Sequence, residues 1–472
     1  MAAQSMATTA ATTAAARRRA RAGARAGART GARTGAVGIV AAALAVTAFA
    51  APAQADTRGP DRTDRAATAD RTDGTAAAAP ERRHRATQRA MDAIVAGGIP
   101  GVTGQVRDRH GVWKGTAGVG NRETGAPRGK NDRFRIASIT KTFVATVLLQ
   151  LEAEGRLDLD DTVDRHLPGL VTGNGHDGTR ITVRQLLSHT SGVFDFYGDE
   201  GYARKYMLAE GFLKHRYDYR SPQAAIAVAM SHPPVFAPGS DYAYSNTNYV
   251  LAALVMEKVT GDTYENQVRE RIIKPLGLRS TTVPGNDSSM PRPSSRAYSK
   301  LSFDPAATTI HDATLQNASQ SWADGDMISS AADLNRFHSA LMRGKLLPGK
   351  QLTAMKTPSA QSVARGEDYG LGLTRVRTGC GTELFGHSGG WIGSLSYALT
   401  TEDGRHALAY NLNGDWSAAG MQELVEAEYC GTAPAAAGKR TDAGAGAGAD
   451  QGPVKGPVKG PVKVFGSGRP TR

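Results

Sequence analysis

The placement of strand patterns at both ends of one long segment, with helices between them, most constrains the fold of this chain. Runs rich in β-branched and aromatic residues, typical of strands, lie at residues 102–107, 112–118, 369–375, 383–385, 394–400 and 407–411. Helical patterns lie at residues 90–96, 138–155, 182–187, 222–230, 248–259, 264–273, 331–342 and 418–429. Strands must pair to satisfy their backbone groups. The pattern therefore predicts one antiparallel sheet built from residues 89–431, with a helical domain inserted and a site where the two meet.

The first 55 residues have the pattern of a cleaved export signal. They contain seven arginines and no acid, then an apolar run at residues 36–51 and the small-residue sequence Ala53-Gln54-Ala55. A membrane anchor is the alternative, but this Ala-rich run is short for a bilayer. We expect cleavage of residues 1–55, secretion, and no stable membrane insertion afterwards. Residues 56–88, rich in Asp, Arg, Thr and Ala, are interpreted as a disordered linker.

Residues 432–472 form a basic low-complexity tail, with Gly-Pro-Val-Lys repeated from Gly452 to Lys463. Such a stretch cannot bury enough apolar surface to fold, so we expect it to be disordered. Weak contact with an anionic cell wall is one interpretation, and a removable spacer is the one we favour. The net charge of +13 resides mainly in the leader and this tail, which leaves about +1 for residues 56–431. A nearly neutral folded part without a nucleic-acid module argues against a nucleic-acid partner.

Ser138 and Lys141 are the first candidate catalytic residues. They form the only Ser-x-x-Lys in the chain and open its most apolar helical pattern. Three residues of helix bring a hydroxyl and an amine to one face, where the amine can take the proton of the hydroxyl. A polar helix start is the structural alternative. We predict that Ser138 is a nucleophile activated by Lys141.

Tyr244 and Asn246 follow Pro238-Gly239 and precede a helical pattern. In extended backbone, residues i and i+2 project to the same side, so both side chains can face one site. A second Tyr-x-Asn, Tyr264-Glu265-Asn266, lies in a helical pattern that would turn its two side chains to different faces. We therefore favour the first pair over the second, and over a purely turn-stabilising role.

His387, Ser388 and Gly389 form a third motif, in a stretch that strand periodicity places at a sheet edge. With the other two motifs it resembles the serine penicillin-recognising family, most closely the secreted Streptomyces D-alanyl-D-alanine carboxypeptidases. The resemblance spans the folded segment, from Phe134-Arg135-Ile136 through Tyr369-Gly370-Leu371-Gly372 to Cys430. The Lys-Thr-Gly motif that is usual in β-lactamases does not occur in the chain.

The resemblance implies an α+β, β-lactamase/transpeptidase-like fold with a five-stranded antiparallel sheet, flanking helices and an inserted, mainly helical domain. It implies that Tyr244 exchanges protons with Ser138 and the leaving amine, and that Asn246 holds the substrate amide. His387 and Ser388 would bind a terminal carboxylate, and the N–H groups of Gly390 and Ser138 would form an oxyanion hole. Trp322 matches a tryptophan near the substrate. Thr374 stands where the closest relatives have a carboxylate-binding arginine.

The implied activity is hydrolysis of peptidoglycan stem peptides ending in D-Ala-D-Ala, through an acyl-enzyme that β-lactams also form. Alternatives are a class C-like β-lactamase, an esterase or D-amino-acid amidase, and a penicillin-binding sensor without useful turnover. No metal or other cofactor is expected, because the chain has no metal-ligand motif such as His-Glu-x-x-His.

The two cysteines, Cys380 and Cys430, are expected to form a disulfide, because an even pair in an exported chain is normally bridged. Closing a loop of this size stabilises a fold by roughly 4 kcal/mol on the chain-entropy view. The bridge would connect a late strand to the last helix.

Overall fold

The structure is a computed structural model that describes residues 83–431. The predicted signal peptide, nearly all of the predicted linker and the predicted tail lie outside the described residues. The first described helix, α2, spans Arg85–Ala96. The folded segment therefore starts before the boundary at residue 89, because Thr87, Ala90, Met91 and Ile94 of this helix are buried.

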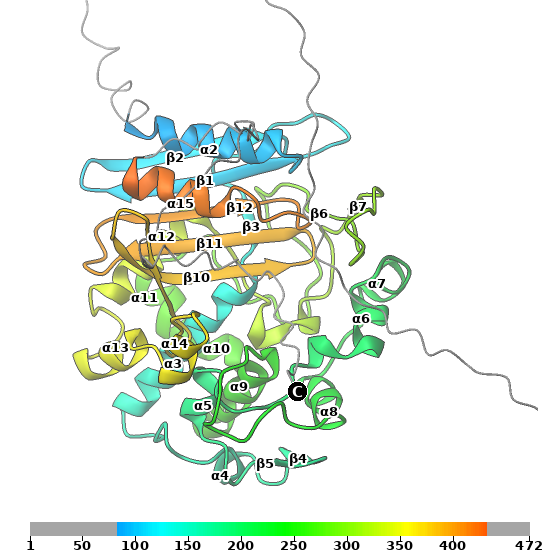
Figure 1. The fold of residues 1–472 in the computed structure, drawn as a ribbon, viewed down its shortest axis with the longest axis vertical. Coiled ribbons are helices and arrows are strands. Elements are labelled where there is room, and N and C mark those ends of the chain that lie inside the picture. Colours follow the sequence, from blue (N-terminus) through cyan, green and yellow to red (C-terminus); the bar gives the residue numbers. More distant parts are fainter. Residues whose placement is uncertain (1–82, 432–472) are drawn as a thin grey trace, which may run out of the picture. The chain divides into compact units, whose positions relative to one another are not determined.

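Six antiparallel strands form the main sheet, in the order β2-β1-β12-β11-β10-β9. The strands are β1 (Gly101–Asp108), β2 (Gly111–Gly118), β9 (Thr374–Arg377), β10 (Glu383–Trp391), β11 (Ser394–Thr401) and β12 (Ala407–Leu412). Figure 1 shows the blue N-terminal strands lying beside the orange C-terminal ones, and β1 pairs with β12 along its length. The predicted fold class is confirmed. The predicted count of five strands is wrong, because β9 pairs with the first half of β10 and adds a sixth.

Helices cover both faces of this sheet. One face of β12 packs into an apolar cluster with α2 and α15 (Met421–Cys430), through Leu408, Tyr410 and Leu412. Ala409, which lies on the opposite face of the strand, belongs to a second cluster. The alternation follows from the two-residue period of a strand. The second cluster contains Phe337 of α12 (Ala331–Met342). Helix α12 packs on β1, β11 and β12. Both faces are thus buried, and β12 is apolar along most of its length.

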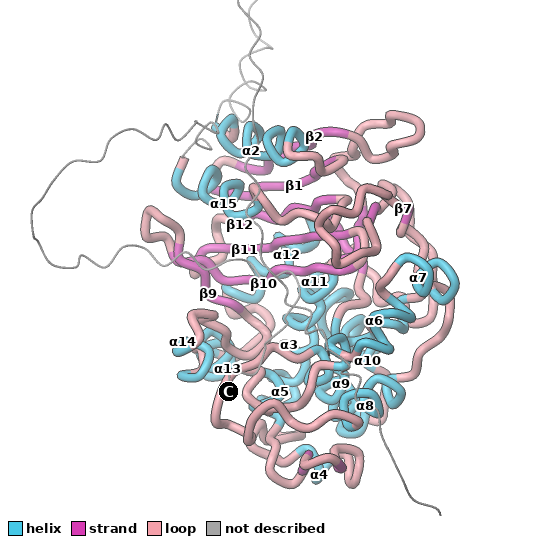
Figure 2. Tube along the Cα trace, turned by 45° about the vertical axis from the view of Figure 1, so that its right-hand side comes forward, coloured by secondary structure: helices cyan, strands magenta, loops and turns pink. Residues whose placement is uncertain are grey.

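The helical region between β2 and β9 is built around α3 (Thr140–Ala153) and α9 (Asn246–Thr260), which pack against each other. Figure 2 shows these helices below the sheet. The remaining helices are α4 (Val163–His166), α5 (Val183–Leu187), α6 (Glu200–Tyr206), α7 (Ala209–His215), α8 (Pro222–Met230), α10 (Tyr264–Val268), α11 (Lys274–Leu276), α13 (Gly349–Lys356) and α14 (Ala360–Ala364). Short strand pairs are β3 (Arg133–Arg135) with β8 (Ile328–Ser330), β4 (Thr172–Gly173) with β5 (His176–Asp177), and β6 (Tyr298–Ser299) with β7 (His311–Asp312).

Two local predictions differ from the structure. The helix predicted at residues 264–273 is divided into α10 and a π-helical turn, Arg269–Ile273, that leads into α11. The strand predicted at residues 369–375 is mostly a turn, because Gly372 has φ +70° and the regular strand starts only at Thr374. A β-carbon at Gly372 would lie 2.6 Å from Cβ of Ala145, so this turn also packs closely on α3.

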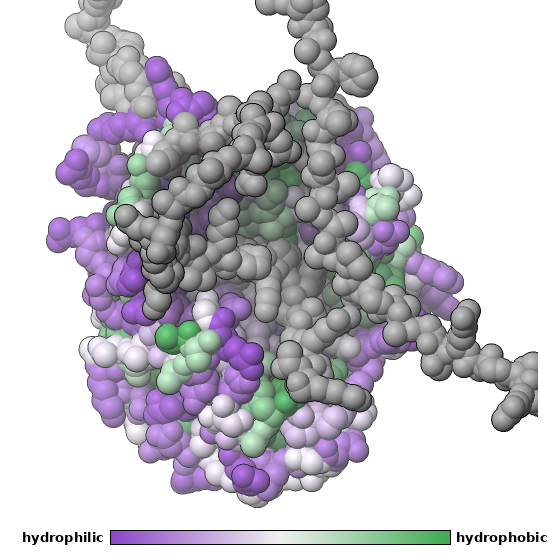
Figure 3. Space-filling model, in the orientation of Figure 1, coloured by the Kyte–Doolittle hydropathy of each residue, from purple (hydrophilic) through white to green (hydrophobic). Residues whose placement is uncertain are grey.

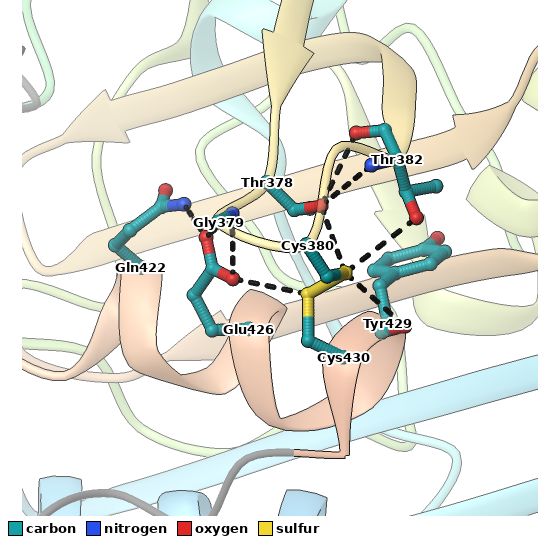
Figure 4. The surroundings of a disulfide bond; sticks show 8 residues. All are labelled: Thr378, Gly379, Cys380, Thr382, Gln422, Glu426, Tyr429 and Cys430. Carbon is teal, nitrogen blue, oxygen red and sulfur yellow. Dashed lines mark hydrogen bonds between the residues drawn. A yellow bond between two sulfur atoms is a disulfide. The ribbon is translucent and has the colours of Figure 1, made fainter. Parts of the chain in front are cut away.

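A disulfide joins Cys380 to Cys430, with their Cα atoms 5.8 Å apart, as predicted. Figure 4 shows the bridge between the turn after β9 and the end of α15, where the Glu426 carboxylate accepts hydrogen bonds from the Gly379 N–H. The bridge and these hydrogen bonds attach the last helix to the edge of the sheet.

The described surface visible in Figure 3 is mainly hydrophilic, with scattered hydrophobic residues. Among residues 83–431, no helix combines the length and apolar character that crossing a membrane requires.

Candidate active site

Ser138 lies in a short 3₁₀ turn, η1 (Ala137–Ile139), which follows β3 and leads directly into α3. The residue before it, Ala137, has φ +49°, a strained conformation for a residue with a side chain. Strand β10 packs against this turn. A β-carbon at Gly389 would lie only 2.1 Å from the carbonyl oxygen of Ile136, so the close approach requires glycine there. The third motif is therefore brought directly against the segment that carries the serine.

Lys141 lies one turn along the same segment and is fully buried. Its Nζ donates hydrogen bonds to Ser138 Oγ at 3.0 Å, Asn246 Oδ1 at 2.8 Å and the Asp324 carbonyl oxygen at 2.7 Å. Burial lowers the pKa of Lys141 to about 8, and the carboxyls of Asp324 and Asp195 oppose this shift only in part. The amine can therefore lose its proton near neutral pH, as a general base must.

Tyr244 packs over this amine, with Lys141 Nζ 5.0 Å from the centre of its ring. Its buried hydroxyl interacts with the Ser138 side chain, although no hydrogen bond of normal geometry joins the two. Burial raises the pKa of Tyr244 well above its usual value, and the Ser138 hydroxyl offsets this only partly. Tyr244 is therefore a protonated phenol at neutral pH, able to donate a proton to a leaving group.

A buried histidine, His189, positions the segment that carries Tyr244. The two rings lie 4.1 Å apart, and His189 Nδ1 accepts a hydrogen bond from the Ser245 N–H at 3.2 Å. Burial lowers the pKa of His189 well below its usual value, and the positive charge of Lys141 lowers it further. His189 is thus neutral, which suits its role as an acceptor.

Asn246 is the first residue of α9, and it bridges Lys141 to Asp195. Its Nδ2 donates to Asp195 Oδ2 at 2.9 Å, which fixes the amide so that Oδ1 faces the lysine. The competing Tyr264 and Asn266 lie apart from Lys141. Tyr264 donates to Asp326, and Asn266 donates to Asp262.

His387, Ser388, Gly389 and Gly390 all lie on β10, which continues beyond the strand predicted at residues 383–385. Ser388 and Gly390 are partly exposed, whereas His387 is buried and its Nε2 lies 3.0 Å from the Tyr369 hydroxyl. Burial lowers the pKa of His387 to about 3, so the ring carries no charge at neutral pH.

The arginines near β10 are paired. Arg375 contacts Asp368 at 3.2 Å, and the largely exposed Arg377 contacts Glu383 at 2.5 Å. Thr374 is partly exposed and supplies no charge. Trp322 is buried, with φ +44° and its indole N–H donated to Glu265 at 3.0 Å. Its indole N–H therefore already has a partner within the protein.

Two carboxyls close to Lys141 were not predicted as site residues. Burial raises the pKa of Asp195 to about 6 and that of Asp324 to about 7, although Asp195 keeps some exposure whereas Asp324 is fully buried. Asp324 accepts a hydrogen bond from the Tyr197 hydroxyl at 3.2 Å. Neither belongs to a short motif, and only the packing of the loops brings them to the lysine. Within residues 83–431, no group of His, Cys, Asp and Glu side chains has an arrangement suited to a metal ion.

Comparison with known proteins identifies the family of this chain. A family model described as Beta-lactamase matches residues 85–428. Penicillin-binding protein 4* of Bacillus subtilis is 27% identical over 307 residues, which cover 64% of this chain and 65% of that protein. The chain thus matches somewhat less than two thirds of that relative's length.

Two solved structures share the fold over most of their length. A D-stereospecific amidohydrolase from a Streptomyces species is 52% identical with a TM-score of 0.69, covering 74% of this chain and 99% of that one. A D-amino acid amidase from Ochrobactrum anthropi, complexed with L-phenylalanine amide, is 29% identical with a TM-score of 0.61, covering 73% and 96%. The family match spans most of the chain and all of the site described above. The chain therefore belongs to the Beta-lactamase family of serine hydrolases.

Proposed function

We propose that this protein is a serine amidohydrolase that transfers D-configured acyl groups from amide donors to water through an acyl-enzyme on Ser138. The observation that carries the proposal is the charge around β10. On the neighbouring strand β9, Arg375 and Arg377 contact carboxylates, and His387 of β10 is uncharged. The Lys141 amine already donates to Ser138, Asn246 and the Asp324 carbonyl. A free terminal carboxylate would therefore be desolvated there without a partner, whereas a neutral amide would not.

The D-configured acyl group is proposed from the similarity to the D-stereospecific amidohydrolase. That protein shares about half of its residues with this chain and is covered almost completely. The second similar structure is a D-amino acid amidase, and its name also supports a D-configured amide donor.

The proposed reaction begins when neutral Lys141 takes the proton of the Ser138 hydroxyl, whose oxygen then forms a bond to the substrate carbonyl carbon. The N–H groups of Ser138 and Gly390 stabilise the resulting oxyanion. The C–N bond breaks as the leaving amine receives a proton through Tyr244, and the ester on Ser138 remains. Water then attacks the ester, transfers a proton to the same base, and releases the acid and the serine hydroxyl.

A matched pair of substrates tests the proposal. The same D-Ala-D-Ala peptide is offered with a free carboxylate and with a C-terminal amide, and release of the last residue is followed. We expect a kcat/KM at least roughly tenfold higher for the amide-blocked peptide, the discrimination that one uncompensated charge allows. A higher kcat/KM for the free carboxylate would contradict the proposal. Ser138→Ala is the control, and it must abolish both reactions.

A D-alanyl-D-alanine carboxypeptidase acting on peptidoglycan stem peptides is the second candidate. The His387-Ser388-Gly389 motif and the match to a penicillin-binding protein support it. Secretion and acylation by β-lactams are predicted for both candidates. Thr374→Arg separates them, because it places a cation on β9 beside β10. If the missing charge limits carboxylate binding, Thr374→Arg raises kcat/KM for the free-carboxylate peptide and Thr374→Met does not. If the native enzyme already binds carboxylates well, neither variant does.

A further inference from the structure

A small cavity behind the nucleophile-bearing segment is lined by four arginines and by no acidic residue. The arginines are Arg128, Arg133, Arg135 and Arg296, and the cavity encloses about 20 Å³. That volume suffices for one particle of the size of a water molecule. Among the other lining residues are Ser295, Thr314 and Asn411, so the walls are polar as well as positively charged.

Two of these arginines are almost completely buried. Arg128 and Arg135 are each 4% exposed. Within residues 83–431, several buried guanidinium nitrogens have no hydrogen-bond partner. They are Nε and Nη1 of Arg128, Nε of Arg133 and Nε of Arg135. Buried guanidinium groups normally have their donors satisfied, because an unpaired charged donor is costly. Nε of Arg128 faces the Asp132 carboxylate at 3.5 Å, which leaves Nη1 of Arg128 and the Nε atoms of Arg133 and Arg135. Unsatisfied donors on three side chains around one cavity indicate that the cavity itself holds an acceptor.

The charge balance distinguishes an anion from a neutral acceptor. Arg128 lies 3.5 Å from Asp132, and Arg296 lies 2.9 Å from Asp312, so these two arginines have carboxylate partners. In the described part of the chain, neither Arg133 nor Arg135 forms a direct ion pair, but the carboxyls of Asp326 and Asp287 act on Arg135 from a longer distance and favour its charged form. Arg133 donates to the Arg279 carbonyl, and Arg135 donates to the Gln316 carbonyl at 2.9 Å. A water molecule would satisfy the donors but would leave the charge of Arg133 without a counter-ion, whereas an anion would satisfy the donors and balance that charge.

We propose that this cavity is a binding site for a small inorganic anion of the size of chloride, held by Arg128, Arg133 and Arg135. The volume of the cavity limits the ligand to a single heavy atom, since phosphate or a carboxylate needs room for several. Access is from the side of Arg133, which is partly exposed, and Arg296, which is exposed. Arg296 keeps Asp312 as its partner, so it lies at the entrance and the other three arginines provide the donors.

The site is separate from the catalytic chemistry but is connected to it through the backbone. Arg135 is three residues before Ser138, and its carbonyl accepts a hydrogen bond from Ser394 Oγ at 2.7 Å. Ser394 also lines the cavity. An anion bound there would stabilise the folded state, because it binds the native arrangement and not the unfolded chain.

Thermal unfolding of the full protein in potassium chloride and in potassium gluconate, at equal ionic strength, tests the proposal. We expect the melting temperature to rise with chloride and to saturate, since a specific site fills whereas general screening does not. Crystals soaked in bromide give a direct measurement, and an anomalous peak is expected in the cavity. Equal melting temperatures in the two salts, together with no bromide peak, would overturn the proposal and assign the cavity to water.

Arg133→Gln provides the matched variant, because Arg133 is partly exposed and its loss is tolerated more readily than that of Arg128 or Arg135. It should weaken the apparent affinity for chloride by roughly tenfold, as expected for loss of one charge-assisted hydrogen bond. The control is Arg377→Gln, an exposed arginine on β9 that does not line the cavity. An unchanged chloride response in Arg133→Gln would contradict the proposed donor set.

Discussion

Lys141 holds its amine between a serine hydroxyl, an asparagine oxygen and a backbone carbonyl, so in the proposed reaction its protonation state governs whether Ser138 can react. Three acceptors stabilise the ammonium form, while burial favours the neutral amine. Burial is the larger effect, and the pKa of Lys141 falls to about 8. The neighbouring Tyr244 has a pKa well above its usual value and stays protonated through the same range.

We therefore predict that the rate of Ser138 acylation rises with pH and levels off above about pH 8, where Lys141 is neutral. Covalent labelling by a fluorescent penicillin, followed at short times across this pH range, measures it. Asp195 and Asp324, with pKa values of about 6 and 7, also titrate nearby. Asp324→Asn is the control, since it removes one of these carboxyls but retains the backbone carbonyl that contacts Lys141. A profile that is flat between pH 6 and pH 9 would exclude Lys141 as the base.

Strand β10 reaches the turn that carries Ser138 only because glycine stands at its point of closest approach. Ile136 O would lie 2.1 Å from a β-carbon at Gly389, and that oxygen belongs to the backbone, which cannot rotate away. Any side chain at this position must push β10 and the η1 turn apart. Ser138 and the proposed oxyanion donor Gly390 lie on these two elements.

Gly389→Ala should accordingly slow acylation by about 10²-fold, the loss expected when reacting groups are displaced by about 1 Å. Penicillin labelling measures the rate, and circular dichroism with thermal unfolding checks that the variant folds. Gly349→Ala is the matched control, because nothing lies within 4 Å of its built β-carbon and its φ is not positive. Wild-type labelling by a folded Gly389→Ala variant would show that the two elements need not meet so closely.

Sequence patterns predicted best those helices and strands in which the spacing of apolar residues matches the face that is buried. The strand around His387, the helix starting at Asn246 and the Ser138–Lys141 pairing were recognisable because short-range spacing determines them. By contrast, Asp195 and Asp324 reach Lys141 through loop packing. The sixth strand, β9, is short and follows a glycine turn, so its pattern placed the strand several residues too early.

At the scale of the whole molecule, a buried carboxylate connects the two ends of the folded segment. Glu428 of α15 lies 3.0 Å from His84 Nδ1 and 2.7 Å from His406 Nε2, and accepts a hydrogen bond from the Thr87 hydroxyl at 2.6 Å. Burial alone would raise the pKa of Glu428. The hydrogen bonds from His406, His84 and Thr87 outweigh burial and lower that pKa to about 2.

A lowered folded-state pKa means that the stabilisation from Glu428 is present above the unfolded value of about 4.5 and is lost as the pH falls towards 2. We predict that Glu428→Gln lowers the free energy of unfolding by about 3 kcal/mol at pH 7. The difference from the wild type should shrink progressively below about pH 4.5. Denaturant unfolding across this range measures it, with the exposed Glu423→Gln as control. A difference that is independent of pH would show that Glu428 acts through packing rather than charge.

The pairing of β1 with β12 also determines when the protein can fold. The first two strands are synthesised early, yet the free edge of β1 stays without its neighbour until almost the entire polypeptide has been made. Contacts this distant in sequence make folding slow. The nascent chain must therefore be kept from aggregating in the meantime.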